Sequence, residues 1–159
     1  AGAGMHWREW RLCPTRFGIP NQRPRYFLTA AREPLGAMEP APAEPGEVGA
    51  YLDDQEDETL YLPPEVLQKH GPGLDLVTAA SRRSACFIGG YGRRYVGSGS
   101  FLRTVRGVRR FSPAEVARLM GFPGPVRFPE ELPLEGRFRL LGNALNVRVA
   151  RWLLGAFRT

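Results

Sequence analysis

Apolar and polar residues alternate over much of the first thirty positions, a pattern typical of extended chain. The run Tyr26-Phe-Leu-Thr-Ala30 is rich in aromatic residues and predicts a strand, which follows a turn at Gly18-Ile-Pro-Asn21. Residues 33–58 break the pattern with proline, alanine and acidic residues. Such a segment buries too little apolar surface to order itself, so we expect a mobile, solvated linker.

A folded pattern resumes at Thr59. The stretch from Leu60 to Leu67 predicts an extended entry into a short helix. Residues 81–100 are rich in glycine and carry interspersed aromatic residues. Because glycine supplies the positive-φ positions of tight turns, this stretch predicts short strands joined by such turns.

The last fifty residues have a helical pattern. Ser112-Pro-Ala-Glu115 is a capping box with proline at the first helical position, and Gly121-Phe-Pro123 ends that helix. A second helix is expected to begin near Asn143 and to run to the end of the chain. Its apolar stripe would consist of residues at positions i, i+4, i+7 and i+8, namely Leu145, Val149, Trp152 and Leu153.

The charge is distributed unevenly along the 159 residues, a length that suits one domain or one small domain plus part of another. Nine of the 16 acidic residues lie in residues 33–58, which leaves seven against all 22 basic residues, a balance of +15. A surface of that charge attracts a polyanion such as nucleic acid. The alternative is a compositional bias towards arginine, alanine, glycine and proline.

Several classes of protein are disfavoured by composition. No run approaches the ~20 apolar residues of a membrane helix, and the first residues do not resemble a signal peptide. Cys13 and Cys86 fit a reducing compartment, so we expect a cytoplasmic location, with the nucleus as an additional one. With two histidines and no CxxC pair, a metal site is not expected.

Three separated motifs follow one another along the chain: Gly18–Phe27, which contains Arg23-Pro-Arg25; Arg110–Pro123; and Arg139-Leu-Leu-Gly-Asn-Ala-Leu-Asn-Val147. They resemble the Arg-x-Arg motif, the late helical motif and the final Gly-Asn motif of cytosine-C5 methyltransferases. The resemblance implies an α/β fold, the C-terminal part of a Rossmann-like methyltransferase domain plus a small target-recognition region. It also implies S-adenosyl-L-methionine as the cofactor.

The resemblance divides the chain into four parts. Residues 1–32 form a strand region of the catalytic domain, and residues 33–58 form the acidic linker. Residues 59–108 form the target-recognition region. Residues 109–159 return to the catalytic domain as helical motifs.

The glycine-rich stretch selects a branch of the family. It resembles the Cys-Phe-Thr segment of the enzymes that modify the anticodon loop of aspartate tRNA, with Ile88 in place of the threonine. The resemblance therefore implies tRNA as the partner. The implied recognition residues are Cys86, Phe87, Tyr91, Arg93 and Arg94.

Arg23 and Arg25 flank Pro24 in an extended segment, so their side chains are expected on one face. A guanidinium fork there can bind a phosphate or a pyrimidine O2, or hold a carboxylate; a salt-bridged strand edge is the alternative. The resemblance implies that both arginines contact the base, with Arg25 at the flipped base and Arg23 beside it. It likewise implies that Gly142 and Asn143 border the cofactor, although asparagine is also a favoured N-cap.

The family reaction needs a thiolate that attacks C6 of an extruded cytosine. In the family this thiol follows a proline, whereas Cys13 precedes one, and Cys86 is better explained as a packed core residue. The sequence also lacks the family's glycine-rich cofactor loop. We therefore expect an inactive and poorly soluble C-terminal part of a tRNA methyltransferase, whether a fragment, a truncated isoform or half of a split enzyme.

The missing N-terminal half would be a partner of such a chain. Three further interpretations remain open from the sequence: part of a DNA cytosine-C5 methyltransferase, a non-catalytic RNA-binding module, and a structural interaction protein built around the acidic linker. The three motifs do not choose between tRNA and DNA, whereas the segment around Cys86 favours tRNA.

Overall fold

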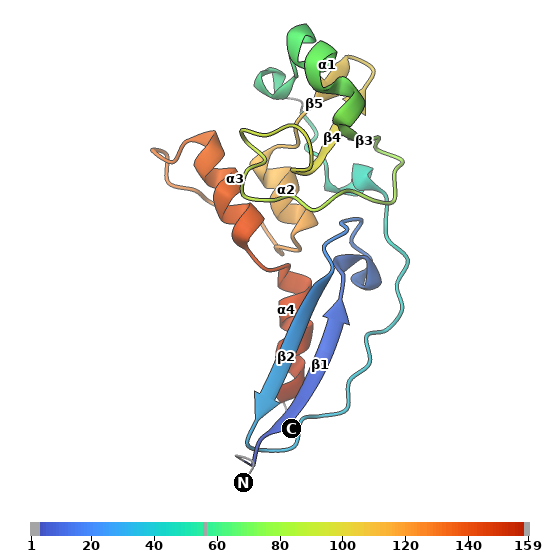
Figure 1. Cartoon of the computed structure of the whole chain (residues 1–159), viewed down its shortest axis with the longest axis vertical. Helices are drawn as coiled ribbons and strands as arrows, with labels where there is room; N and C mark the ends of the chain where they lie inside the picture. Colours follow the sequence, from blue (N-terminus) through green and yellow to red (C-terminus); the bar gives the residue numbers. More distant parts are fainter. Residues whose placement is uncertain (1–3, 56, 158–159) are drawn as a thin grey trace.

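The computed structural model describes residues 4–55 and 57–157, which form a mixed helix and sheet structure with two sheets (Figure 1). A long β-hairpin packs on the last helix at one end of the molecule. A small three-stranded sheet and the other helices occupy the opposite end (Figure 1). Among these described residues no helix is long and apolar enough to cross a membrane.

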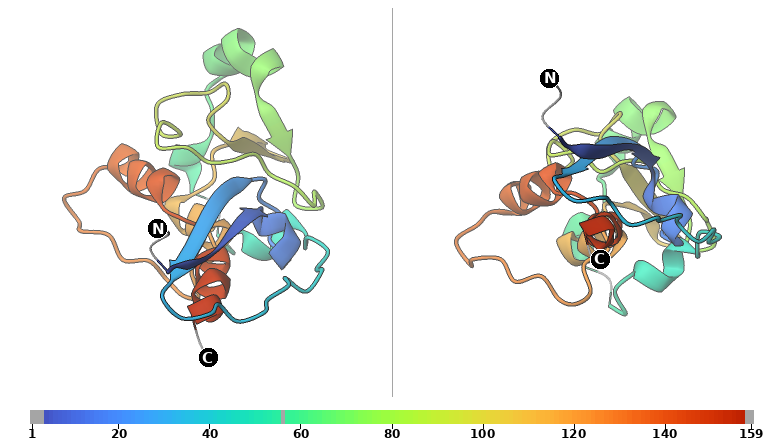
Figure 2. Two further views of the ribbon diagram at one scale, coloured as in Figure 1. Left: turned by 60° about the horizontal axis from the view of Figure 1, so that its bottom comes forward. Right: turned by 90° about the horizontal axis from the view of Figure 1, so that it is seen from below.

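The hairpin consists of β1 (His6–Leu12) and β2 (Arg25–Ala31), antiparallel and in register from His6 opposite Ala31 to Leu12 opposite Arg25. The strand predicted at residues 26–30 is confirmed as β2. Helix α4 (Val147–Leu154) lies along one face of the hairpin, as Figure 2 shows. Alternation along both strands turns one set of side chains towards α4, and a small apolar core forms there from Leu12, Trp10, Phe27, Val149, Trp152 and Leu153.

The second sheet has the order β3 (Asp75–Val77), β4 (Ser100–Thr104) and β5 (Gly107–Arg109). β3 is parallel to β4, and β4 is antiparallel to β5. The expected short helix is confirmed as α1 (Pro64–His70). Short 3-10 turns occupy Pro14–Phe17, Val48–Tyr51, Glu58–Leu60, Gly71–Gly73 and Gly155–Phe157.

The expectation of short strands between residues 81 and 99 is wrong, because this stretch contains only turns and bends. Its backbone instead winds closely around an aromatic core. At Gly99, whose φ is +149°, an added Cβ would lie 2.6 Å from the Phe87 ring. The packing therefore requires a glycine at this position.

That core is a cluster of rings around Tyr91, which is fully buried. The Tyr91 hydroxyl donates to the Ser100 carbonyl at 2.7 Å and accepts from the Phe111 amide at 2.9 Å. Burial raises the pKa of Tyr91 well above its ordinary value, so this hydroxyl stays protonated. The rings that surround it are Phe87, Phe101, Phe111 and Phe138.

The capping box is confirmed at the start of α2 (Pro113–Leu119). The Ser112 hydroxyl accepts from the Glu115 amide at 3.1 Å, and the Glu115 carboxylate accepts from the Ser112 amide at 2.7 Å. Gly121, with a φ of +78°, turns the chain away after the helix. Local sequence was sufficient here because all the interacting groups lie within one turn.

The expectation of a single helix from Asn143 onward is wrong, because two helices meet in this region. Asn143 ends α3 (Leu134–Asn143), and Asn146 caps α4 by accepting from the Arg148 and Val149 amides. Leu145 lies between the helices and is 55% exposed, so it is not part of the apolar stripe. Two helices form because the chain bends over residues 144–146, where the Asn146 side chain satisfies the free amides.

The acidic segment is also more ordered than expected. Val48 is fully buried, and its amide donates to the Ser81 carbonyl at 2.8 Å. Asp53 accepts from the Ser112 hydroxyl at 2.6 Å and from the Arg118 guanidinium at 2.5 Å. The expectation of a mobile linker is therefore wrong for residues 48–53. Val48 is buried in the core, and Asp53 binds the N-cap residue and a helical residue of α2.

Candidate functional site

Arg23 joins three segments that are far apart in the chain. Its side chain is buried, and its Nη1 donates to the Phe87 carbonyl at 2.9 Å and approaches the Cys86 Sγ at 3.0 Å. Its Nη2 donates to the carbonyls of Gly142 and Ala144, both at 2.9 Å. The hairpin, the glycine-rich stretch and the end of α3 thus meet at one guanidinium.

Arg25 differs from Arg23 in its exposure. Its Nη1 donates to the adjacent Pro24 carbonyl at 2.8 Å, and its Nη2 lies 3.5 Å from the Cys86 Sγ. Both arginines therefore approach the same sulfur, as the expected common face requires. The expectation that Arg23 is available to a base is corrected, because carbonyl groups already occupy both of its terminal nitrogens.

Cys86 lies between these two guanidiniums and is half-buried. It is therefore a boundary residue rather than the fully packed core residue expected from the sequence. Cys13 lies on the other side of Arg23, where its Sγ accepts from the Arg23 amide at 3.3 Å. Both cysteines are free thiols.

Gly142 permits the close approach of α3 to the glycine-rich stretch. An added Cβ would lie 2.2 Å from the Gly89 nitrogen, so no side chain fits. The adjacent Asn143 is exposed. A cavity of ≈ 10 Å³ beside Arg25 and Leu145 is far below the ~300 Å³ of small-molecule pockets, and neither Gly142 nor Asn143 lines it.

The five predicted recognition residues separate into two groups. Phe87 and Tyr91 are 1% and 0% exposed, so their assignment to substrate contact is corrected: they are core residues. Arg93 and Arg94 are exposed, and the Arg93 Nε lies 3.6 Å from a Glu135 carboxylate oxygen. Cys86, Arg93 and Arg94 thus remain accessible to a ligand.

A buried ion pair that the sequence did not predict lies next to the capping box. Arg109 and Glu115 form two hydrogen bonds of 2.7 and 2.8 Å, with side chains 3% and 0% exposed. The Asp53 amide donates to the same carboxylate at 3.0 Å. The only sequence signal was Glu115 in the capping box, which gives no information about Arg109.

Comparison with known proteins gives a consistent picture. The family model described as C-5 cytosine-specific DNA methylase matches residues 76–158. A tRNA (cytosine(38)-C(5))-methyltransferase of Bos taurus is 28% identical over 246 aligned positions that cover 95% of this chain and 63% of the relative. The Homo sapiens protein of that name is 37% identical over 65% of this chain and 34% of its own length.

Among solved structures, the Schizosaccharomyces pombe Dnmt2 methyltransferase superposes with a TM-score of 0.85 at 29% identity. The match covers 96% of this chain and 57% of that one. The chain thus spans between a third and two thirds of the length of these relatives.

Proposed function

The chain belongs to the C-5 cytosine-specific DNA methylase family, and from this premise we propose that it is the C-terminal, substrate-recognising part of an S-adenosylmethionine-dependent tRNA cytosine-C5 methyltransferase. The observation that carries the proposal is the convergence at Arg23. Its guanidinium gathers the Arg-x-Arg segment, the Cys-Phe segment and the Gly-Asn segment, and leaves Arg25 exposed beside Cys86.

In this proposal Arg25 and Arg23 have different roles. Arg25 contacts the flipped cytosine, whose O2 is a suitable acceptor for a guanidinium N–H. Arg23 is a positioning residue that holds the start of β2 against the segments carrying Cys86 and Gly142. The cofactor supplies the methyl group, and Gly142 and Asn143 form one border of its pocket.

The proposal assigns the hairpin and residues 109–159 to the catalytic domain and residues 59–108 to target recognition. The exposed Arg93 and Arg94 stand at the edge of the recognition region nearest α3, where Arg93 approaches Glu135. They are suited to phosphates of the tRNA backbone, because guanidinium groups bind phosphate bidentately.

The uncovered face of the hairpin supports a missing catalytic half. Trp7, Tyr26 and Leu28 are 61%, 57% and 59% exposed, on the face opposite α4. Large apolar side chains that are exposed together on one face of a sheet are typical of an interaction site. We propose that an upstream polypeptide carrying the nucleophile and the cofactor loop covers it, and that this chain alone is inactive.

The experiment compares methyl transfer and binding. The 159-residue chain is incubated with radiolabelled S-adenosylmethionine and either tRNA or duplex DNA, and tRNA affinity is measured against salt concentration. We expect no transfer by the chain alone. We also expect Arg93→Ala/Arg94→Ala to lower the log–log salt slope by about 1–2, since each phosphate contact contributes about 0.7–0.9.

The charge-matched control is Arg103→Ala/Arg127→Ala, which removes two exposed arginines elsewhere. An equal change of slope in both variants would contradict recognition by Arg93 and Arg94. Stronger binding to DNA than to tRNA would favour the DNA-acting alternative. If a longer polypeptide binds tRNA with a steep dependence on salt concentration but transfers no methyl group, the RNA-binding module would be favoured.

A further inference from the structure

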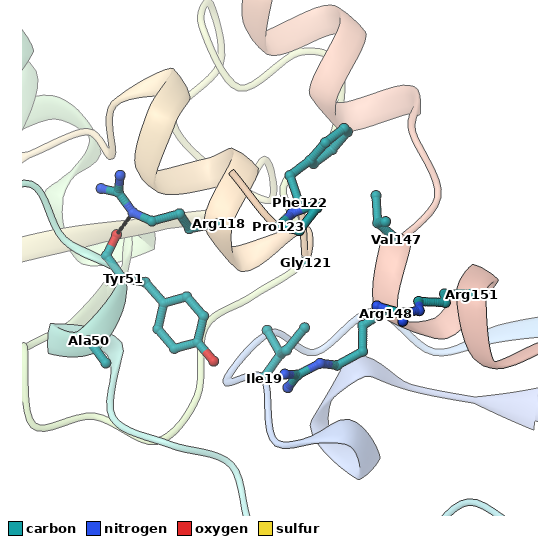
Figure 3. Close-up of a pocket in the computed structure, with 10 residues that line it drawn as sticks. All are labelled: Ile19, Ala50, Tyr51, Arg118, Gly121, Phe122, Pro123, Val147, Arg148 and Arg151. Carbon is teal, nitrogen blue, oxygen red and sulfur yellow. Dashed lines mark hydrogen bonds between the residues drawn. The ribbon is translucent and has the colours of Figure 1, made fainter. Parts of the chain in front are cut away.

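A second, larger cavity opens on the other side of α4 from the Arg25 site. Its volume is ≈ 320 Å³, and it lies between the end of α2, the start of α4 and the turn at Val48–Tyr51 (Figure 3). Val149 turns towards the hairpin, whereas Val147, Arg148 and Arg151 line this cavity. It is therefore separate from the surface around Arg25.

Hydrogen bonds connect the two helix ends that border the cavity. The Val147 amide donates to the Met120 carbonyl at 2.8 Å, and the Asn146 Nδ2 donates to the Leu119 carbonyl at 3.2 Å. An added Cβ at Gly121 would lie 3.0 Å from the Arg148 nitrogen. The end of α2 and the start of α4 are thus locked in contact, so the cavity is preformed.

Its walls combine apolar surface with positive charge. Ile19, Phe122 and Val147 belong to the apolar lining, and the Tyr51 ring lies on the side of Ile19 (Figure 3). The Tyr51 hydroxyl donates to the Gly18 carbonyl at 3.4 Å, and burial raises the pKa of Tyr51, so the hydroxyl stays protonated and its oxygen can accept from a ligand.

The three arginines of the cavity are unequally engaged. Arg118 pairs with Asp53 and donates to the Tyr51 carbonyl. Arg148 makes one hydrogen bond, from Nη1 to the Phe17 carbonyl at 2.9 Å. Within residues 4–55 and 57–157, Arg151 has no hydrogen bond or ion pair, and Arg148 has no carboxylate partner. Two guanidiniums one helical turn apart therefore lack a counter-ion.

We infer that this cavity binds a nucleotide, with its phosphate on Arg148 and Arg151 and its base on the apolar wall beside Tyr51. Side chains three apart on a helix are neighbours, so the two guanidiniums can share one phosphate. The volume falls in the ~300–1,000 Å³ range of small-molecule pockets. The nucleotide is either a unit of an RNA strand or a free mononucleotide, since both present the same phosphate and ring.

The chemistry of the cavity disfavours two other ligands. A purely apolar molecule would leave the two unpaired charges uncompensated as it displaces their water. S-adenosylmethionine carries a sulfonium and an ammonium group against a single carboxylate, so the guanidiniums would repel its net positive charge. The inference does not depend on the methyltransferase proposal, because it rests on the cavity alone.

The test titrates the isotopically labelled 159-residue chain with 5′-AMP, with adenosine and with a short single-stranded RNA, following NMR shifts of Ala50, Gly121 and Arg151. Arg148→Ala/Arg151→Ala removes the phosphate contacts. Ala50→Trp fills the cavity from an exposed position on its wall and keeps every arginine. Arg103→Ala/Arg127→Ala is the control with the same loss of charge, and a melting curve checks that each variant is folded.

We expect at least tenfold weaker binding of 5′-AMP or RNA in the first two variants and less than twofold change in the control. Saturable shifts with 5′-AMP indicate a free nucleotide, and shifts with RNA alone indicate a strand. Equal weakening in the control, unchanged binding in Ala50→Trp, adenosine binding as tight as 5′-AMP, or no saturable shift with either phosphate probe overturns the inference. None of these outcomes affects the tRNA assignment, which is tested at Arg93 and Arg94.

Discussion

Arg23 and Gly142 are separated by 119 positions in the chain, yet the Arg23 guanidinium donates a 2.9 Å hydrogen bond to the Gly142 carbonyl. The contact is possible because Gly142 has no side chain where the Gly89 backbone passes. The two residues therefore depend on each other: the glycine brings α3 against the glycine-rich stretch, and the arginine closes the junction with the hairpin.

The first prediction separates Arg23 from Arg25 by stability. Arg23→Ala should lower the free energy of unfolding by about 3 kcal/mol, because it leaves several buried carbonyls without donors. Arg25→Ala should cost less than about 0.5 kcal/mol, since that side chain is exposed. Urea denaturation of both variants measures the difference. Equal losses would mean that the junction does not depend on Arg23.

This contrast illustrates what the sequence could predict. The capping box at Ser112 and the strand at Tyr26 were predictable because their determinants are local. The burial of Arg23 was not, because its acceptors lie 64 to 121 positions away. An Arg-x-Arg pattern identifies two side chains on one side of a segment, but it does not show which of them the rest of the fold covers.

The same limit explains the errors at Phe87, Tyr91 and Asn143. An aromatic residue in a recognition motif can serve the ligand or the core, and only the packing around Gly99 and Phe138 decides for the core. Asn143 and Asn146 are both credible caps by sequence. Asn146 is selected because its side chain also donates to the Leu119 carbonyl, a contact between two helices.

The second prediction concerns the Arg109–Glu115 pair. Glu115→Gln should destabilise the fold by about 3 kcal/mol, because it removes the carboxylate charge from a buried guanidinium and weakens the helix cap. Glu58→Gln is the matched control: its ion pair with Arg106 is exposed and should contribute less than about 1 kcal/mol. Chemical denaturation of each variant, and of Arg109→Met/Glu115→Leu, provides the measurement.

The double variant makes the second prediction more specific. If the buried charge is the main cost, apolar residues of similar size at both positions should recover much of the loss seen in Glu115→Gln. A double variant as unstable as the single one would show that the contacts of Glu115 with the Ser112 and Asp53 amides dominate instead.

The third prediction is a pH dependence of the segment fastened by Asp53. Burial alone would raise the pKa of this carboxyl, but hydrogen bonds from Arg118 and Ser112 outweigh it and hold the pKa below its ordinary value of 3.8. A depressed pKa contributes stability that is complete above 3.8 and is lost as the pH falls through the folded value.

Hydrogen exchange at the Val48 and Gly49 amides measures this loss, since both donate to carbonyls of residues 79–81. Their protection factors should fall as the pH is lowered below about 4. Asp53→Asn should reduce protection at neutral pH and flatten the pH profile. A variant with the wild-type profile would show that Asp53 does not hold this segment.

The fourth prediction tests the uncovered face of the hairpin through Leu28, which is 59% exposed and lies opposite Glu9 in the strand register. Leu28→Lys should leave the melting temperature of the chain nearly unchanged, because the new charge faces water and a carboxylate across the strand pair. It should also raise the concentration at which light scattering begins, because it interrupts the apolar patch. Phe27→Lys, one residue away but directed at α4, should instead unfold the hairpin core.

The same substitution distinguishes a merely apolar surface from an interface. If an upstream polypeptide covers this face, Leu28→Lys in the longer protein would bury an ammonium group against apolar side chains and lower its melting temperature strongly. The variant would thus improve the behaviour of the 159-residue chain and impair that of the longer protein. Similar melting temperatures for the wild type and the variant in both contexts would show that the face is exposed to solvent in each, and that the proposed upstream polypeptide does not cover it.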